Sequence, residues 1–155
     1  MALLTDTLNI IFRRDLLKLK EELNLYNHEE NLWRVEGNIS NTAGNLCLHL
    51  IGNLNTYIGD VLGHTGYVRN RPEEFSLKNI PREMLLTELD RTIKVIEDVL
   101  PRLTETQLAD EYPQPVFEYS MTTGYFLVHL ATHLNYHLGQ VNYHRRLLDV
   151  DPHLR

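Results

Sequence analysis

The chain has 155 residues, of which 43% are hydrophobic and 23% are charged. These fractions rule out collagen-like and low-complexity chains and argue against wholesale disorder, so we expect a single domain over residues 1–155. Lys and Arg total 15 against 21 Asp and Glu, which gives a formal net charge of −6. Because nucleic-acid binding draws affinity from a basic surface, this charge argues against a nucleic-acid partner.

No stretch of about 18 uncharged apolar residues occurs, so we expect no membrane-spanning helix. The chain starts at Met1 and Ala2 without a basic segment followed by a long apolar run. We therefore expect no signal peptide and a cytoplasmic location. The single cysteine, Cys47, cannot form an internal disulfide and follows Leu46 in an apolar stretch. It is expected to be a buried small hydrophobic side chain rather than a nucleophile.

Four segments repeat their apolar residues at the three- and four-residue spacing of a helix with one buried face. They are residues 8–26, 47–61, 81–103 and 122–148. Ser40, Asn41 or Thr42 can cap the second segment. Pro81 suits the first turn of the third segment, and Pro101 is expected to end or kink that helix.

The remaining stretches show no period-two alternation, so we assign no sheet. Two connections, residues 64–80 and 112–120, contain glycine or proline and are expected to be irregular. Between them, Thr104 and Gln107 fit a capping box and predict a short extra helix. Since four amphipathic helices each need a partner for their apolar face, the sequence predicts an all-α four-helix bundle with crossover connections.

Three histidines in the last helical segment, His129, His133 and His137, follow one another at intervals of four residues. Positions four apart lie about 6 Å apart on one face, close enough for two imidazoles to hold one ion. The outermost two are about 12 Å apart along the axis, so the three cannot all bind one ion. At about 100° per residue, His133 and His137 lie nearest the apolar face. We predict that these two are ligands and that His129 is an outer or solvent-facing residue.

Two imidazoles make a weak site, so a third ligand must come from another helix. Glu-x-x-His, His-Glu-x-x-His and Cys-x-x-Cys do not occur. The best remaining candidate is His49, which lies in a ladder of polar residues at four-residue spacing together with Asn41, Asn45 and Asn53. Gly52 lies beside the ladder and would let a neighbouring helix approach closely. The alternative interpretation is a plain solvent-facing stripe.

The other histidines carry no chemistry in this interpretation. Three are expected on the surface: His28, His64 and His153. His144 is expected near a helix end, stabilised by the helix dipole.

The run Leu46-Cys47-Leu48-His49-Leu50-Ile51-Gly52-Asn53, followed later by His133-Leu-Asn-Tyr-His137-Leu-Gly-Gln140, resembles the DinB-like superfamily. The resemblance covers nearly the whole chain. It includes the segment 69–75, Arg-Asn-Arg-Pro-Glu-Glu-Phe, which is similar to a loop in a bacterial branch of unknown function. The resemblance implies a four-helix bundle in which His49, His133 and His137 bind a divalent metal ion, zinc or nickel.

The resemblance also implies a class of chemistry. Some relatives are transferases or isomerases that use a low-molecular-weight thiol, bacillithiol or mycothiol, and pairing into a homodimer is expected. Our first hypothesis is therefore a metal-dependent thiol S-transferase acting on a small-molecule substrate. The alternatives are a metal-dependent hydrolase, a non-catalytic metal- or ligand-binding module, and a metal-free helical interaction protein whose histidines flank the core.

Overall fold

The computed structural model describes residues 3–151, 153 and 154. Over these residues the long helices are α1 (Leu3–Asn24), α2 (Ala43–Leu54), α4 (Arg82–Val99) and α6 (Thr123–Leu148). The shorter elements are η1 (Glu29–Trp33), the π-helical turn η2 (Asn55–Asp60), α3 (Arg71–Ser76), η3 (Leu100–Arg102) and α5 (Glu105–Ala109). Within the described part no strand forms beyond an isolated bridge between Glu111 and Thr122, so the all-α prediction is confirmed.

The helix boundaries follow the capping residues in the sequence. Thr42 and Thr122 cap α2 and α6, because each hydroxyl accepts a hydrogen bond from a backbone N–H three residues further on. Thr104 and Gln107 form the predicted capping box at the start of α5. The helix α4 ends two residues before Pro101, and the chain continues into η3, as the proline predicts.

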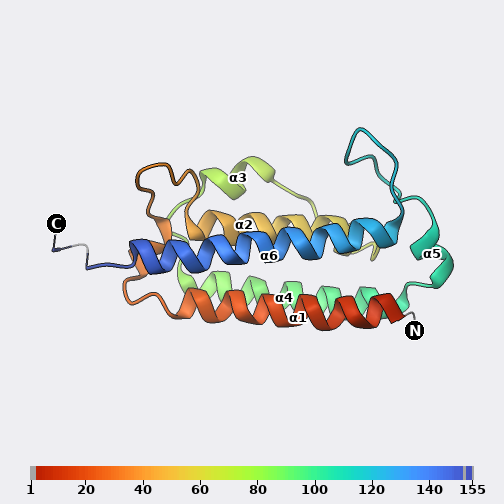
Figure 1. Ribbon diagram of the computed structural model, residues 1–155, viewed down its shortest axis with the longest axis horizontal. Coiled ribbons are helices and arrows are strands. Elements are labelled where there is room, and N and C mark those ends of the chain that lie inside the picture. The colour runs from red at the N-terminus through yellow and green to blue at the C-terminus, as the bar shows by residue number, and fades with distance from the viewer. Residues whose placement is uncertain (1–2, 152, 155) are drawn as a thin grey trace.

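The long helices form two layers, α1 with α4 and α2 with α6 (Figure 1). Helices α1 and α6 run in one direction, and α2 and α4 run in the opposite direction (Figure 1). Each of α1 and α2 contacts both α4 and α6, so α1 and α2 lie diagonally across the bundle. Residues 61–81 return along the bundle and carry α3 over α2 (Figure 1). The predicted four-helix bundle with a crossover connection is confirmed.

The core consists of the apolar faces that predicted the helices. Phe12 and Phe126 are among the largest fully buried side chains. All the apolar residues that set the spacing of the first and last helical segments are buried: Leu8, Phe12, Leu16, Leu19, Leu23 and Tyr26 in the first, and Leu127, Leu130, Leu134, Val141 and Leu148 in the last. Truncating a buried phenylalanine of this kind costs about 3–5 kcal/mol. The helices are therefore held by tertiary packing, which fixes the direction in which their polar residues point.

The crossover connection is more ordered than predicted. Residues 64–80 were expected to be irregular, but they contain the helix α3. Asn70 caps this helix by accepting a hydrogen bond from the Glu73 backbone N–H, and Pro72 occupies its first turn. The run Asn-Arg-Pro-Glu-Glu is thus the start of a helix, which was not predicted because the helix has only six residues.

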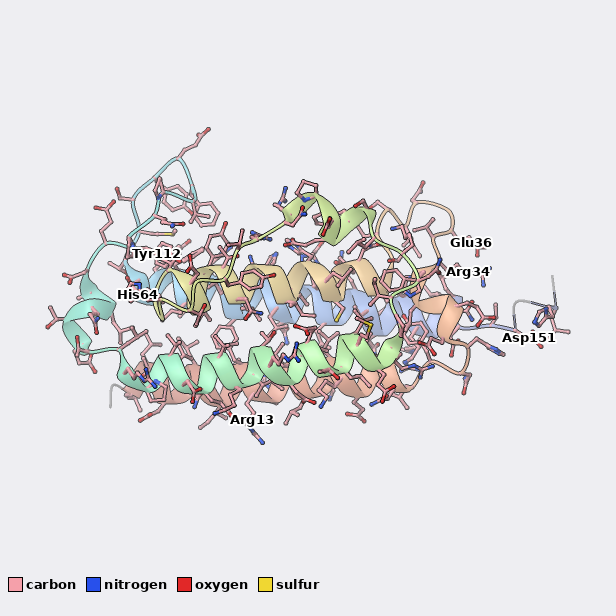
Figure 2. All side chains as sticks on the ribbon, turned by 180° about the vertical axis from the view of Figure 1, so that it is seen from behind. Arg13, Arg34, Glu36, His64, Tyr112 and Asp151 are labelled. Carbon is pink, nitrogen blue, oxygen red and sulfur yellow. The ribbon has the colours of Figure 1, made fainter. Side chains whose placement is uncertain are left out.

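His144 lies near the end of α6, as predicted, but hydrogen bonds rather than the helix dipole hold it. The ring is buried between Tyr26 and the backbone of Arg34, and burial disfavours the charged form that the dipole would stabilise. This contact lies at the end of the bundle where Arg34 and Asp151 are found, whereas His64 and Tyr112 mark the other end (Figure 2).

The three histidines expected on the surface follow the prediction in part. His64 and His153 are exposed, and His28 is half-buried. No helix among the described residues is long and apolar enough to cross a bilayer. The start at Met1 and Ala2 lies outside the described residues.

Candidate metal centre

Two helices from distant parts of the chain bring three imidazoles together. His49 projects from α2, and His133 and His137 project from α6. The Nε2 atom of His133 lies 3.2 Å from Nε2 of His49 and 3.1 Å from Nε2 of His137. One ring nitrogen from each residue lies within 4.8 Å of those from the other two. The three predicted ligands therefore face a common point.

These separations match those of ligands on one metal ion. Zinc holds imidazole nitrogens at about 2.0–2.1 Å, so two nitrogens in a tetrahedral sphere lie roughly 3.3 Å apart. The rings of His49 and His137 stand edge-on to each other, with centroids 5.3 Å apart and an interplanar angle of 89°. The short separations between Nε2 atoms show that ring nitrogens meet in the space between the three side chains.

Glu74 of α3 fixes the orientation of His49. Its Oε1 atom lies 3.0 Å from Nδ1 of His49, and both side chains are buried. A carboxylate only accepts hydrogen bonds, so the proton resides on Nδ1 and the lone pair on Nε2. This leaves His49 in the tautomer that a metal ligand needs.

Arg69 holds the Glu74 carboxylate in place. Its Nε donates to Oε2 at 2.8 Å and its Nη2 donates to Oε1 at 2.9 Å, a two-point pairing. Burial alone would raise the pKa of Glu74, but hydrogen bonds from His49 and Arg69 outweigh it and lower the pKa. The guanidinium also lies over the Tyr57 ring, 5.7 Å from its centroid. Glu74 is thus an ionised carboxylate whose charge is balanced by Arg69.

On α6, a second partner orients His137. The Nδ1 atom of His137 lies 2.7 Å from Oε1 of Gln140, one turn further along the helix. Because the amide oxygen accepts, Nδ1 carries the proton here as well, and Nε2 presents its lone pair. By contrast, Nδ1 of His133 is buried and has no hydrogen-bond partner among the described residues.

Burial favours the neutral form of the α6 ligands. Burial, together with the positive charges that His137 and His49 would carry, lowers the pKa of His133 to about 4. Burial also lowers the pKa of His137, although the hydrogen bond to Gln140 opposes this change. Both rings are therefore neutral at pH 7, which is the form that binds metal.

His129 stands beside the three rings without joining them. It is half-buried and stacks on His133, with ring centroids 6.3 Å apart and planes 19° apart. Its other neighbours are Phe117 and Phe126, at centroid distances of 5.0 and 5.9 Å. This position agrees with an outer residue, packed against aromatic rings rather than directed to solvent.

The polar ladder of α2 does not face solvent. Asn45, His49 and Asn53 are all buried, so the alternative of a solvent-facing stripe is wrong. Cys47 is also buried, and burial raises its pKa, which excludes it as a thiolate nucleophile in this fold.

The sequence prediction did not identify Glu74 or Gln140 as partners of the ligands. The signal for Gln140 is its position three residues after His137 on the same helix. Glu74 lies in the segment 69–75 that supported the family resemblance, but its contact with His49 requires the crossover to fold back over α2.

Comparisons with known proteins agree with this architecture. A crystal structure of a conserved protein from Enterococcus faecalis is similar, with a TM-score of 0.75 and 20% sequence identity over 96% of this chain and 98% of that one. A likeness at this identity shows a shared fold. No curated protein matches the sequence. The family model described as the DinB superfamily matches residues 11–141. The chain therefore belongs to the DinB superfamily.

Proposed function

We propose that the protein binds one divalent metal ion through His49, His133 and His137. The observation that carries this proposal is the convergence of their ring nitrogens from two helices, with Nε2 separations of 3.1 and 3.2 Å. Glu74 and Gln140 support it, because they leave bare nitrogen lone pairs on His49 and His137 pointing to one place. A cation is the natural occupant of such a place.

The donor set indicates the class of ion. Three neutral imidazoles suit zinc or nickel and are poor ligands for calcium or magnesium, which prefer oxygen. Because Arg69 balances the charge of Glu74, the protein donors leave the charge of the ion uncompensated. An anionic fourth ligand is therefore favoured over a neutral one.

We propose further that this fourth ligand is the sulfur of a small thiol, such as bacillithiol, in an S-transfer reaction. When bound, the ion supplies a Lewis acid that lowers the pKa of a ligated thiol or water. In this reaction the thiol would lose its proton to solvent, its sulfur would form a bond to an electrophilic carbon of the substrate, and the leaving group would depart with its electron pair. His133 and His137 stay neutral and take no proton, since burial keeps their pKa values low.

Hydrolysis is the weaker alternative. An ion held by three imidazoles would lower the pKa of a bound water, but general-base assistance to that water would need a free carboxylate nearby. Among the described residues, the carboxylate that contacts this group of histidines is Glu74, which reaches only His49. Its Oε1 accepts hydrogen bonds from His49 and Arg69, and its Oε2 accepts one from Arg69. It is therefore not free to take up a proton. Thiol chemistry makes no such demand, since a thiol loses its proton far more readily than water.

A non-catalytic role is the second candidate, and one observation favours it. The three histidines belong to α2 and α6, so an ion between them would cross-link two helices and stabilise the folded state. A thiol that enters the coordination sphere distinguishes the enzyme from this structural site.

Metal analysis of protein made without a histidine tag tests the proposal. We expect one zinc or nickel ion per chain by mass spectrometry after gel filtration, and its absence even after metal supplementation would overturn it. For the thiol step, the cobalt-loaded protein is titrated with bacillithiol. A sulfur-to-cobalt charge-transfer band is expected, whereas an unchanged spectrum would leave the structural role.

A further inference from the structure

We infer that Glu74 is the positioning residue of the metal centre and that Gly52 is the position on α2 that admits it. The inference rests on the proposed metal site and adds a role for the crossover connection. Glu74 would not touch the ion. It acts through His49 by holding the ring so that Nε2 faces His133 and His137.

Gly52 is the residue of α2 that leaves space for the Glu74 carboxylate. A Cβ atom on Gly52 would lie 1.9 Å from Oε2 and 2.7 Å from Cδ of Glu74. Real side chains do not approach so closely, so any other residue at position 52 must displace the carboxylate. The backbone of Gly52 is helical, so its conformation does not demand a glycine. A glycine is required there because it leaves room for the contact between Glu74 and His49.

Hydrogen bonds hold α3, the helix that carries Glu74, against α2 one turn before His49. The buried Asn45 donates its amide hydrogens to the backbone oxygens of Glu74 and Leu77, at 2.9 and 2.8 Å. Two residues of the α2 ladder, Asn45 and His49, therefore bind the backbone and the side chain of the same glutamate. This arrangement places the carboxylate with little freedom of movement.

Without Glu74, none of the described residues would hold the proton on Nδ1 of His49. Arg69 Nη2 lies 3.4 Å from Nδ1 of His49 and can only donate, so it would favour a proton on Nε2 instead. A ring protonated at Nε2 cannot ligate through that atom. Loss of a carboxylate that orients a ligating histidine commonly lowers metal affinity by about 10–100-fold.

Three variants and one control separate this role from general damage. Glu74→Ala removes the acceptor, Glu74→Gln keeps an acceptor oxygen without charge, and Gly52→Ala keeps Glu74 but displaces it. The control is Gly139→Ala, which adds the same methyl group to a helical glycine of α6 with open space around it. Circular dichroism of each variant confirms that the helical content is unchanged.

The measurements are the Kd for zinc, by competition with a chelator, and the visible spectrum of the cobalt-loaded protein. We expect Kd to rise about 10–100-fold in Glu74→Ala and Gly52→Ala, less in Glu74→Gln, and not in Gly139→Ala. We also expect a changed cobalt spectrum in the first two variants, because His49 is no longer held in the coordination sphere.

Two failures are distinguishable. If the unaltered protein takes up no metal, the proposed function and the positioning role both fall. If it binds zinc but Glu74→Ala and Gly52→Ala bind with the same Kd and the same cobalt spectrum, the metal site stands and the role of Glu74 is overturned.

Discussion

The Tyr26 hydroxyl donates a hydrogen bond to Nδ1 of His144 over 2.7 Å and so joins the segment after α1 to the last turns of α6. The other ring nitrogen, Nε2, donates to the backbone oxygen of Arg34 at 2.7 Å. Burial favours the neutral ring, and its proton then lies on Nε2 because the Arg34 carbonyl can only accept. His144 thus closes one end of the bundle as an uncharged residue.

Stability should depend on pH through His144. Burial lowers its pKa below the ordinary value of 6.5. The unfolded chain therefore takes up a proton that the folded protein does not, and the free energy of unfolding should fall as the pH drops below about 6.5. Urea unfolding of metal-free protein at pH 7.5 and pH 5.5 checks this.

The variant His144→Gln is the control. It should be less stable than the unaltered protein at pH 7.5 by about 1–3 kcal/mol, and its free energy of unfolding should fall less on acidification. An equal loss in both proteins would contradict the assignment.

A second prediction concerns the contact between α1 and α6. Glu22 is buried and accepts hydrogen bonds from Asn142 and Arg145, each at 2.7 Å. Arg145→Met leaves the carboxylate without its cation and should lower the free energy of unfolding by about 2 kcal/mol. Chemical denaturation measures the change. The exposed pair of Arg91 and Glu88 provides the control, because Arg91→Met should cost less than about 0.5 kcal/mol. Similar losses in both variants would show that burial of Glu22 does not matter.

Much of the fold could be predicted from periodicity alone. The spacing of apolar residues gives the long helices because each helix buries one continuous face, and the structure places the last helix at Thr123–Leu148 against a predicted 122–148. The short helix α3 was missed, since six residues are too few to establish a periodicity. The π-helical turn after α2 was missed for a different reason, because its apolar residue Ile58 continues the α-helical spacing.

For the candidate site, too, positions on one helix could be predicted, whereas contacts between elements could not. Angular position on one helix sufficed to prefer His133 and His137 over His129, because a helix fixes the relative directions of its own side chains. Contacts between elements could not be read in this way. The partner of His49 lies 25 residues away on the crossover, and the partner of His144 lies 118 residues away. Periodicity predicts which face of a helix is buried, but the residues that this face contacts depend on how the whole bundle packs.

Metal uptake should persist to a lower pH than for exposed histidines. A proton competes with the metal for each ring nitrogen, and competition begins when the pH approaches the pKa of the ring. Since burial lowers the pKa of His133 to about 4, protonation of this ligand should begin only well below its ordinary value of 6.5. The Kd for zinc measured between pH 7.5 and pH 4.5 checks this. A weakening around pH 6.5 with the slope of three competing protons would contradict the lowered pKa values of His133 and His137.

The choice of ligands is tested by removing each ring in turn. His49→Ala and His133→Ala should each raise the Kd for zinc by more than about 100-fold, since loss of a ligand costs more than loss of its hydrogen-bond partner. His129→Ala should retain stoichiometric uptake, because this ring packs against Phe117 and Phe126 and lies outside the three that converge. Titration of metal-free protein with zinc gives both stoichiometry and Kd. Equal loss in all three variants would mean that His129 belongs to the coordination sphere, and that α6 places a different pair of histidines at the ion.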